Sequence, residues 1–155
     1  MSPPWSLGSG IFHTDFDVRI RGRTLAQLYS LGVGLGLVVS GLAGFLVDSS
    51  FVVGGQVHGH ALVLFETNGW HNLLHLTAGA LGLAAFSSPR LSRSFAVGWG
   101  ATAAVLASWA AVTTYPAFGL IPGGTGGILF HLFDASTGVL TWLLSAPMSS
   151  MSREV

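Results

Sequence analysis

The sequence predicts an all-α fold, a bundle of four transmembrane helices with both termini on the cytoplasmic side. Half of its 155 residues are hydrophobic and only 8% are charged, whereas an average soluble chain carries about 25% charged residues. The few charges are also clustered, and the uncharged runs between them are long enough to cross a hydrocarbon layer of about 30 Å as helices. We therefore expect one membrane domain covering residues 1–155.

The predicted helices cover residues 24–47, 67–87, 94–115 and 127–145. The first is longer than the apolar core of a signal peptide and no A-x-A cleavage site follows it, so we expect a retained anchor. The second ends at a Ser-Ser-Pro-Arg turn. The last two lie in one uncharged stretch, residues 94–133, which is about twice as long as a single crossing requires. Prolines and glycines at residues 116–127 divide that stretch.

All six arginines fall on one side of this arrangement. Three precede the first helix, Arg90 and Arg93 lie between the second and third, and Arg153 follows the fourth. Because positive charge is retained on the cytoplasmic side, residues 48–66 and 116–126 form the outer loops. The sequence thus predicts a multi-pass protein of a bacterial inner (plasma) membrane.

Glycine spacing predicts close helix packing. Gly32, Gly36, Ser40 and Gly44 follow one another at i, i+4 along the first helix. Such a ridge of small residues allows a neighbouring membrane helix to approach closely. We expect this ridge to be the packing face. The predicted partners of the chain are the lipid bilayer and either a second copy of the chain or the subunits of a larger membrane complex.

Composition and motifs argue against several functions. The chain has no cysteine, which excludes disulfides, thiolate metal sites and thiol nucleophiles. Its net charge of zero argues against nucleic-acid binding. No serine lies in a G-x-S-x-G motif, and Asn72 follows His71 where a zinc protease motif has Glu. We expect a binding or accessory protein rather than an enzyme.

The candidate site lies near the outer ends of the second and fourth predicted helices. His71 and His75 are at i, i+4, and His131 and Asp134 are at i, i+3, so each pair shares one helix face. His71 and His131 each lie about one turn, roughly 6 Å, below the outer end of their helix. If the two helices are neighbours, these four side chains converge. Ionisable groups at such depth face the bundle interior and mark functional sites.

The sequence leaves four interpretations of this cluster open. His71, His75, His131 and Asp134 are candidate ligands of a transition metal. Three further residues surround the mouth of the pocket as candidate outer partners: Glu66, Asn68 and Asn72. A haem held by one histidine from each helix is the second interpretation. The third is a hydrogen-bond network without a ligand, and the fourth is a proton-coupled carrier or relay.

A motif in the second helix resembles a known family. Residues 68–76 read Asn-Gly-Trp-His-Asn-Leu-Leu-His-Leu, and Gly79 and Gly82 follow. This stretch is similar to the N-G-W-H-N-L-x-H-L motif of an uncharacterised family of small four-helix bacterial membrane proteins, mainly actinobacterial. His131 resembles the family's further histidine near the start of the last helix, although the H-L-x-x-G pattern is not repeated there. The resemblance implies the topology and the importance of the histidines, and it supplies no reaction.

Overall fold

The structure is a computed structural model that describes residues 19–20, 22–55 and 57–145. Its helices are α1 (Leu25–Val47), α2 (Gly69–Ala85), α3 (Pro89–Val112) and α4 (Thr125–Leu144). Two short antiparallel strand pairs accompany them. The pair of β1 (Arg19–Ile20) and β2 (Arg23–Thr24) precedes α1, and the pair of β3 (His60–Leu62) and β4 (Phe65–Thr67) lies between α1 and α2. The predicted helical fold with four helices in this order is confirmed. Arg21 and Arg153, used above to predict orientation, lie outside the described residues.

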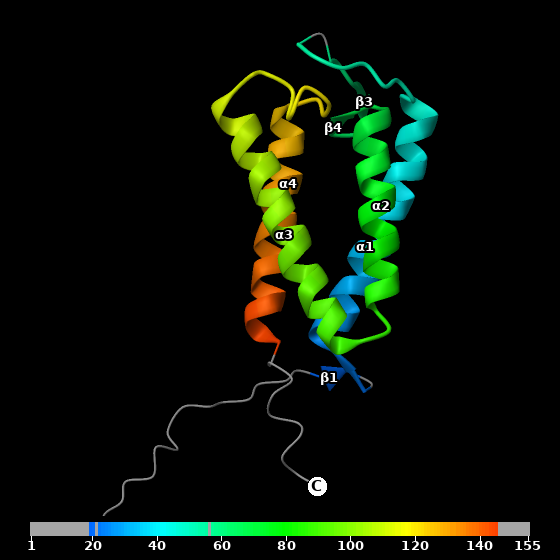
Figure 1. Ribbon diagram of the computed structural model, residues 1–155, viewed down its shortest axis with the longest axis vertical. Coiled ribbons are helices and arrows are strands. Elements are labelled where there is room, and N and C mark those ends of the chain that lie inside the picture. The colour runs from blue at the N-terminus through cyan, green and yellow to red at the C-terminus, as the bar shows by residue number, and fades with distance from the viewer. Residues whose placement is uncertain (1–18, 21, 56, 146–155) are drawn as a thin grey trace, which may run out of the picture.

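The helices form two pairs, α1 with α2 and α3 with α4, and contacts within each pair outnumber those between the pairs. Figure 1 shows the pairs close together at the α2–α3 turn and separated at the β3–β4 hairpin. The start of α1 and the end of α4 lie at the same end of the bundle as the α2–α3 turn. We call this the turn end, and the opposite one the hairpin end.

Glycines bring α1 and α2 into direct backbone contact. A Cβ on Gly34 would lie 3.0 Å from the backbone of α2, and one on Gly79 would lie 2.8 Å from the backbone of α1. The predicted ridge is only partly right. Gly44 faces α2, but no described atom lies within 4 Å of a Cβ built on Gly32 or Gly36. Small residues occupy several faces of α1, so their spacing alone does not select the packing face.

Polar side chains share the interior with mostly small apolar ones, and large apolar side chains cover much of the surface. The largest fully buried side chains are those of Asn68, Asn72, Thr67, Ser30 and Ser92. Every helix exposes large aliphatic side chains: Leu46, Leu81, Val112 and Leu143 are 91%, 61%, 83% and 62% exposed. Of the described helices, α1, α3 and α4 are long and apolar enough to cross a membrane. A surface rich in large apolar side chains, with polar side chains buried beneath it, is typical of a membrane protein.

The helix boundaries differ from the predicted ones for local reasons. The third helix begins at Pro89, five residues before the predicted residue 94, because proline is well suited to the first helical position. It ends at Val112, ahead of the predicted residue 115. The second helix has 17 residues and begins after Asn68, whose side chain caps it. The β3–β4 hairpin was not predicted.

Alanine substitutions test the α1–α2 contact. Gly79→Ala places a methyl group 2.7 Å from the Val38 side chain and 2.8 Å from the Gly34 carbonyl oxygen. We expect it to lower the free energy of unfolding in detergent by about 1–3 kcal/mol, the usual cost of overpacking. Gly32→Ala is the matched control and should change it by less than about 0.5 kcal/mol. Equal effects of the two substitutions would contradict this packing.

Candidate functional site

Asn68 fixes where α2 begins and therefore how deep His71 lies. Its side-chain oxygen accepts a hydrogen bond from the backbone N–H of His71 at 2.9 Å. Its side-chain nitrogen donates to the carbonyl oxygen of Leu120, in the α3–α4 loop, at 2.8 Å. Asn68 is fully buried. Asn68 thus caps the helix and holds the loop that leads into α4, instead of lining the pocket.

Asn72 joins three segments at the hairpin end. Its side-chain nitrogen donates to the carbonyl oxygen of Asp48, at the end of α1, at 2.8 Å. Its side-chain oxygen accepts a hydrogen bond from the hydroxyl of Thr67 in β4. A Cβ on Gly44 would collide with the Asn72 amide, so this glycine makes room for it. Asn72 therefore faces α1 and does not line the cavity described below.

The hydrogen bond from His71 to β4 determines its tautomer. The Nδ1 atom lies 3.1 Å from the main-chain carbonyl oxygen of Glu66. Because a carbonyl oxygen only accepts, Nδ1 carries the hydrogen and Nε2 of the neutral ring has a lone pair. That Nε2 atom is buried and has no hydrogen-bond partner within the described part of the chain. The Glu66 side chain itself is exposed, so Glu66 acts through its backbone.

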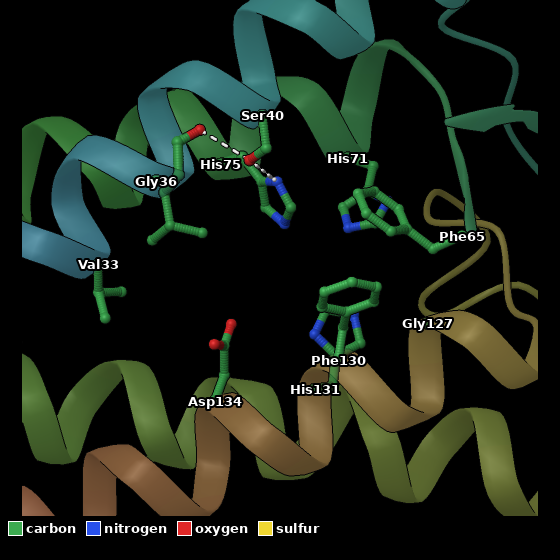
Figure 2. A pocket seen from close by; sticks show the side chains of 11 residues that line it. Val33, Gly36, Ser40, Phe65, His71, His75, Gly127, Phe130, His131 and Asp134 are labelled. Atoms are coloured by element: carbon green, nitrogen blue, oxygen red, sulfur yellow. Dashed lines mark hydrogen bonds between the residues drawn. The ribbon is translucent and has the colours of Figure 1, made fainter. Parts of the chain in front are cut away.

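His75 is held in the same tautomer by α1. The Ser40 hydroxyl donates its single hydrogen to the carbonyl oxygen of Leu37 at 3.0 Å. When the hydroxyl donates to Leu37, it accepts a hydrogen bond from Nδ1 of His75, which lies 2.9 Å away. The lone pair of His75 is then on Nε2, and Figure 2 shows that ring nitrogen directed into the cavity.

His131 and Asp134 face the two α2 histidines from α4 (Figure 2). The ring centroid of His71 lies 4.4 Å from that of His75 and 5.8 Å from that of His131. His131 is buried, and its Nδ1 has no partner among residues 19–20, 22–55 and 57–145. Asp134 accepts a hydrogen bond from the indole nitrogen of Trp99, on α3, at 3.1 Å.

These groups line one cavity of about 200 Å³ between the helix pairs. Its lining consists of Val33, Gly36, Leu37, Ser40, Phe65, His71, His75, Gly127, Phe130, His131 and Asp134. The structure thus brings all four predicted ligands to one cavity, while Glu66, Asn68 and Asn72 lie outside its lining. As they stand, no three His, Asp or Glu side chains of the described ranges are arranged to hold a metal ion.

The size of the cavity bears on the haem interpretation. Pockets for drug-sized ligands measure about 300–1,000 Å³, and haem is larger than most such ligands. The cavity of about 200 Å³ is smaller than this range, which does not favour a haem between the helix pairs. It does accommodate an ion with its remaining ligands or several water molecules, since water takes about 30 Å³ in the liquid.

An ion pair lies at the hairpin end of the bundle. Nδ1 of His60 lies 2.7 Å from the carboxylate of Asp48, which also accepts from the backbone N–H of Ser50 at 2.8 Å. Burial alone would raise the pKa of Asp48, but the hydrogen bonds from Ser50 and His60 outweigh it and lower the pKa to about 2. The pair ties β3 to the end of α1.

Comparison with known proteins identifies the family. Residues 27–144 match the family described as Domain of unknown function (DUF4383). The chain belongs to this family. The predicted membership of an uncharacterised family is confirmed, and no curated protein or solved structure matches the chain. Since membership of DUF4383 carries no activity, the function has to be argued from the site.

Sequence reasoning missed three side chains that shape the site of this DUF4383 chain. Ser40 orients His75, Trp99 holds Asp134, and Phe65 packs against His71 with ring centroids 5.9 Å apart. Ser40 was predicted only as a small residue of the packing ridge, and no role was predicted for Trp99. Nothing in the linear spacing indicates that α1 and α3 would deliver these partners. The N-terminal His13 lies outside the described residues.

The low pKa of Asp48 predicts a pH-dependent contribution to stability. Because the folded state favours the ionised carboxylate, the contribution is complete above the usual pKa of 3.8 and is lost as pH falls through about 2. Asp48→Asn should lower the free energy of unfolding at pH 6 by about 1–2 kcal/mol. The difference from the wild type, measured by thermal unfolding in detergent, should vanish near pH 2. Glu66→Gln, at an exposed carboxylate, should have no effect at either pH.

Proposed function

We propose that this chain is a four-span protein of the plasma membrane that binds one transition-metal ion near the outer face. His71, His75 and His131 are the proposed ligands, and Asp134 is the proposed fourth ligand or charge partner. One observation carries the proposal. His71 and His75 both have Nδ1 occupied by an outer partner, and both therefore present the lone pair of Nε2 to the same cavity.

This arrangement is characteristic of metal-binding histidines. A histidine that binds a metal almost always donates its other ring N–H to a carbonyl, a carboxylate or water, which fixes the tautomer and orients the ring. The Glu66 carbonyl has this role for His71, and the Ser40 hydroxyl has it for His75. A purely structural network would instead be expected to satisfy the buried Nε2 of His71, because an unpaired buried polar atom is costly.

The ring separations support a shared ion. With a metal–nitrogen bond of about 2.0–2.1 Å, the ring centroid of a bound imidazole lies about 3.2 Å from the metal. Two rings on one ion therefore have centroids up to about 6.4 Å apart. The observed separations of 4.4 Å and 5.8 Å fall within this limit.

The ligand types favour a zinc, copper or iron ion. Imidazole suits these metals, whereas magnesium and calcium prefer sites made entirely of oxygen ligands. Three neutral imidazoles leave the charge of a divalent ion uncompensated in a low-dielectric environment. Asp134, held by Trp99 in the lining of the same cavity, supplies the nearest negative charge.

Charge placement supports the proposed orientation. Arg23 lies over the ring of Phe86 and Arg93 over the ring of Trp142, with 4.9 Å between guanidinium carbon and ring centroid in each case. Both pairs belong to the turn end, whereas Asp48 belongs to the hairpin end. By the positive-inside rule the turn end is cytoplasmic and the cavity opens nearer the outer face. In this arrangement α2 spans with α1, although α2 has only 17 residues.

A proton relay is the second candidate, and Tyr29 favours it. The Tyr29 hydroxyl is buried and has no hydrogen-bond partner in the ranges that the structure describes. A Cβ built on Gly138 would lie 3.0 Å from the Tyr29 hydroxyl oxygen. Gly138 is one helical turn from Asp134 along α4, toward the turn end. This hydroxyl extends the polar groups of the cavity toward the proposed cytoplasmic side.

Metal content tests the first proposal. The protein is purified in mild detergent, loaded with Zn²⁺ or Co²⁺, passed over a desalting column and measured by elemental analysis. We expect about one ion per chain in the wild type. His71→Ala and His131→Ala should each reduce metal affinity at least tenfold, because each removes a ligand.

His58→Ala is the matched control, since His58 is an exposed histidine outside the cavity. It should retain the wild-type stoichiometry. Metal binding that persists in His71→Ala and His131→Ala but is lost in His58→Ala would contradict the proposed site. Proton flux into liposomes that falls in Tyr29→Phe, without any bound metal, would favour the relay.

Single cysteines test the topology, because the natural chain has none. Thr114→Cys lies in the α3–α4 loop and Ser87→Cys in the α2–α3 turn, and both positions are exposed. A membrane-impermeant maleimide added to intact cells should label Thr114→Cys, and should label Ser87→Cys only after lysis. The reverse pattern would invert the orientation, and labelling of both from outside would exclude α2 as a span.

A further inference from the structure

We propose that the cavity also admits a phenol or quinol from the bilayer, whose oxygen becomes a further ligand of the metal. The ligand enters sideways, through an opening between α1 and α4. This inference rests on the proposed metal site and names the class of molecule that the site would take. Four features of the cavity support it, concerning its opening, its polar end, its volume and a neighbouring groove.

The opening is at the depth of the acyl chains. Gly36, the middle residue of α1, belongs to the cavity lining and is itself exposed. No described atom lies within 4 Å of a Cβ built there. Phe130 of α4 also lines the cavity and is 44% exposed. The cavity is therefore reached from the lipid-facing surface between these two helices.

The inner end of the cavity offers acceptor atoms and, when loaded, a metal with room for another ligand. The Nε2 lone pairs of His71 and His75 are directed into it. With Asp134 as charge partner and not as ligand, an ion with three imidazole ligands keeps one position open for a further donor, as in catalytic zinc sites. No arginine or lysine belongs to the lining, so the ion would be the one cationic group that the cavity offers to an oxygen donor. The rest of the lining is mostly apolar, which suits a donor whose remaining atoms are apolar.

The volume and the aromatic walls match a single ring. An apolar cavity of about 150 Å³ in another protein binds benzene, and this one measures about 200 Å³. Phe65 and Phe130 form one wall, with ring centroids 5.0 Å apart in an edge-to-face arrangement. A further aromatic ring would pack favourably against either of these two rings. Val33 and Leu37 form the apolar wall on α1.

A second depression gives the tail of such a molecule a place to lie. It is an apolar groove of about 490 Å³ lined by Leu64, Gly126, Leu129, Phe130 and Phe133. Phe130 is shared by the groove and the cavity. An alkyl or isoprenoid tail that leaves the cavity past Phe130 would therefore meet an apolar surface on α4. Ring and tail together describe a lipid-soluble quinol.

The test uses two leucine substitutions on α1. Gly36→Leu places a side chain in the opening, whereas Gly32→Leu adds the same side chain one turn away, outside the cavity lining. Both glycines are exposed, with free space beyond a Cβ, so both variants should fold. Each protein is loaded with Co²⁺ in nanodiscs without oxygen and titrated with a benzoquinol that carries one isoprene unit. The visible Co²⁺ absorption reports the coordination of the ion.

We expect the quinol to change the Co²⁺ spectrum of the wild type and of Gly32→Leu. In Gly36→Leu the ion should remain bound, and the apparent quinol affinity should fall at least tenfold. The same quinol with both hydroxyls methylated should leave the wild-type spectrum unchanged. A wild-type spectrum that does not respond to the quinol, or equal responses of the two variants, would overturn this inference while the metal site stands. Failure of the wild type to bind Co²⁺ would overturn both.

Discussion

The hydrogen bonds of two buried asparagines at the start of α2 determine how the hairpin end is assembled. Asn68 ties the helix to the loop before α4, and Asn72 ties it to the end of α1 and to β4. Both side chains are buried, so losing one of these bonds would leave an unpaired polar group that water does not reach, which is costly. Through them, one end of α2 fixes the positions of three other segments, and His71 lies between the two asparagines.

The two tight helix pairs explain why a cavity exists. Gly34 and Gly79 bring α1 against α2, close enough for Ser40 to reach His75. In the other pair, a Cβ on Gly138 would lie 2.6 Å from the Ala96 carbonyl oxygen, so α3 and α4 are equally close. The pairs separate toward the hairpin end (Figure 1). Polar side chains from α2 and α4 thus face each other across a space that the helices leave unfilled.

The sequence predicted what depends on local pattern. Uncharged runs located the helices, and the i, i+4 and i, i+3 spacings placed His71 with His75 and His131 with Asp134. What depends on helix rotation and on contacts distant in sequence was not predictable. The i+4 ridge selected Gly32 and Gly36, whereas packing uses Gly34, because a helix with small residues on several faces has no unique packing face. The serine and tryptophan that orient His75 and Asp134 come from helices whose rotation the sequence does not specify.

The central claim is that imidazoles from α2 and α4 bind one metal ion inside the membrane domain. X-ray absorption spectroscopy of the zinc-loaded protein tests this claim most directly, because imidazole rings give a recognisable multiple-scattering pattern. The account predicts three imidazole nitrogens at about 2.0–2.1 Å from zinc. A first shell made only of oxygen atoms, or a single imidazole, would contradict it.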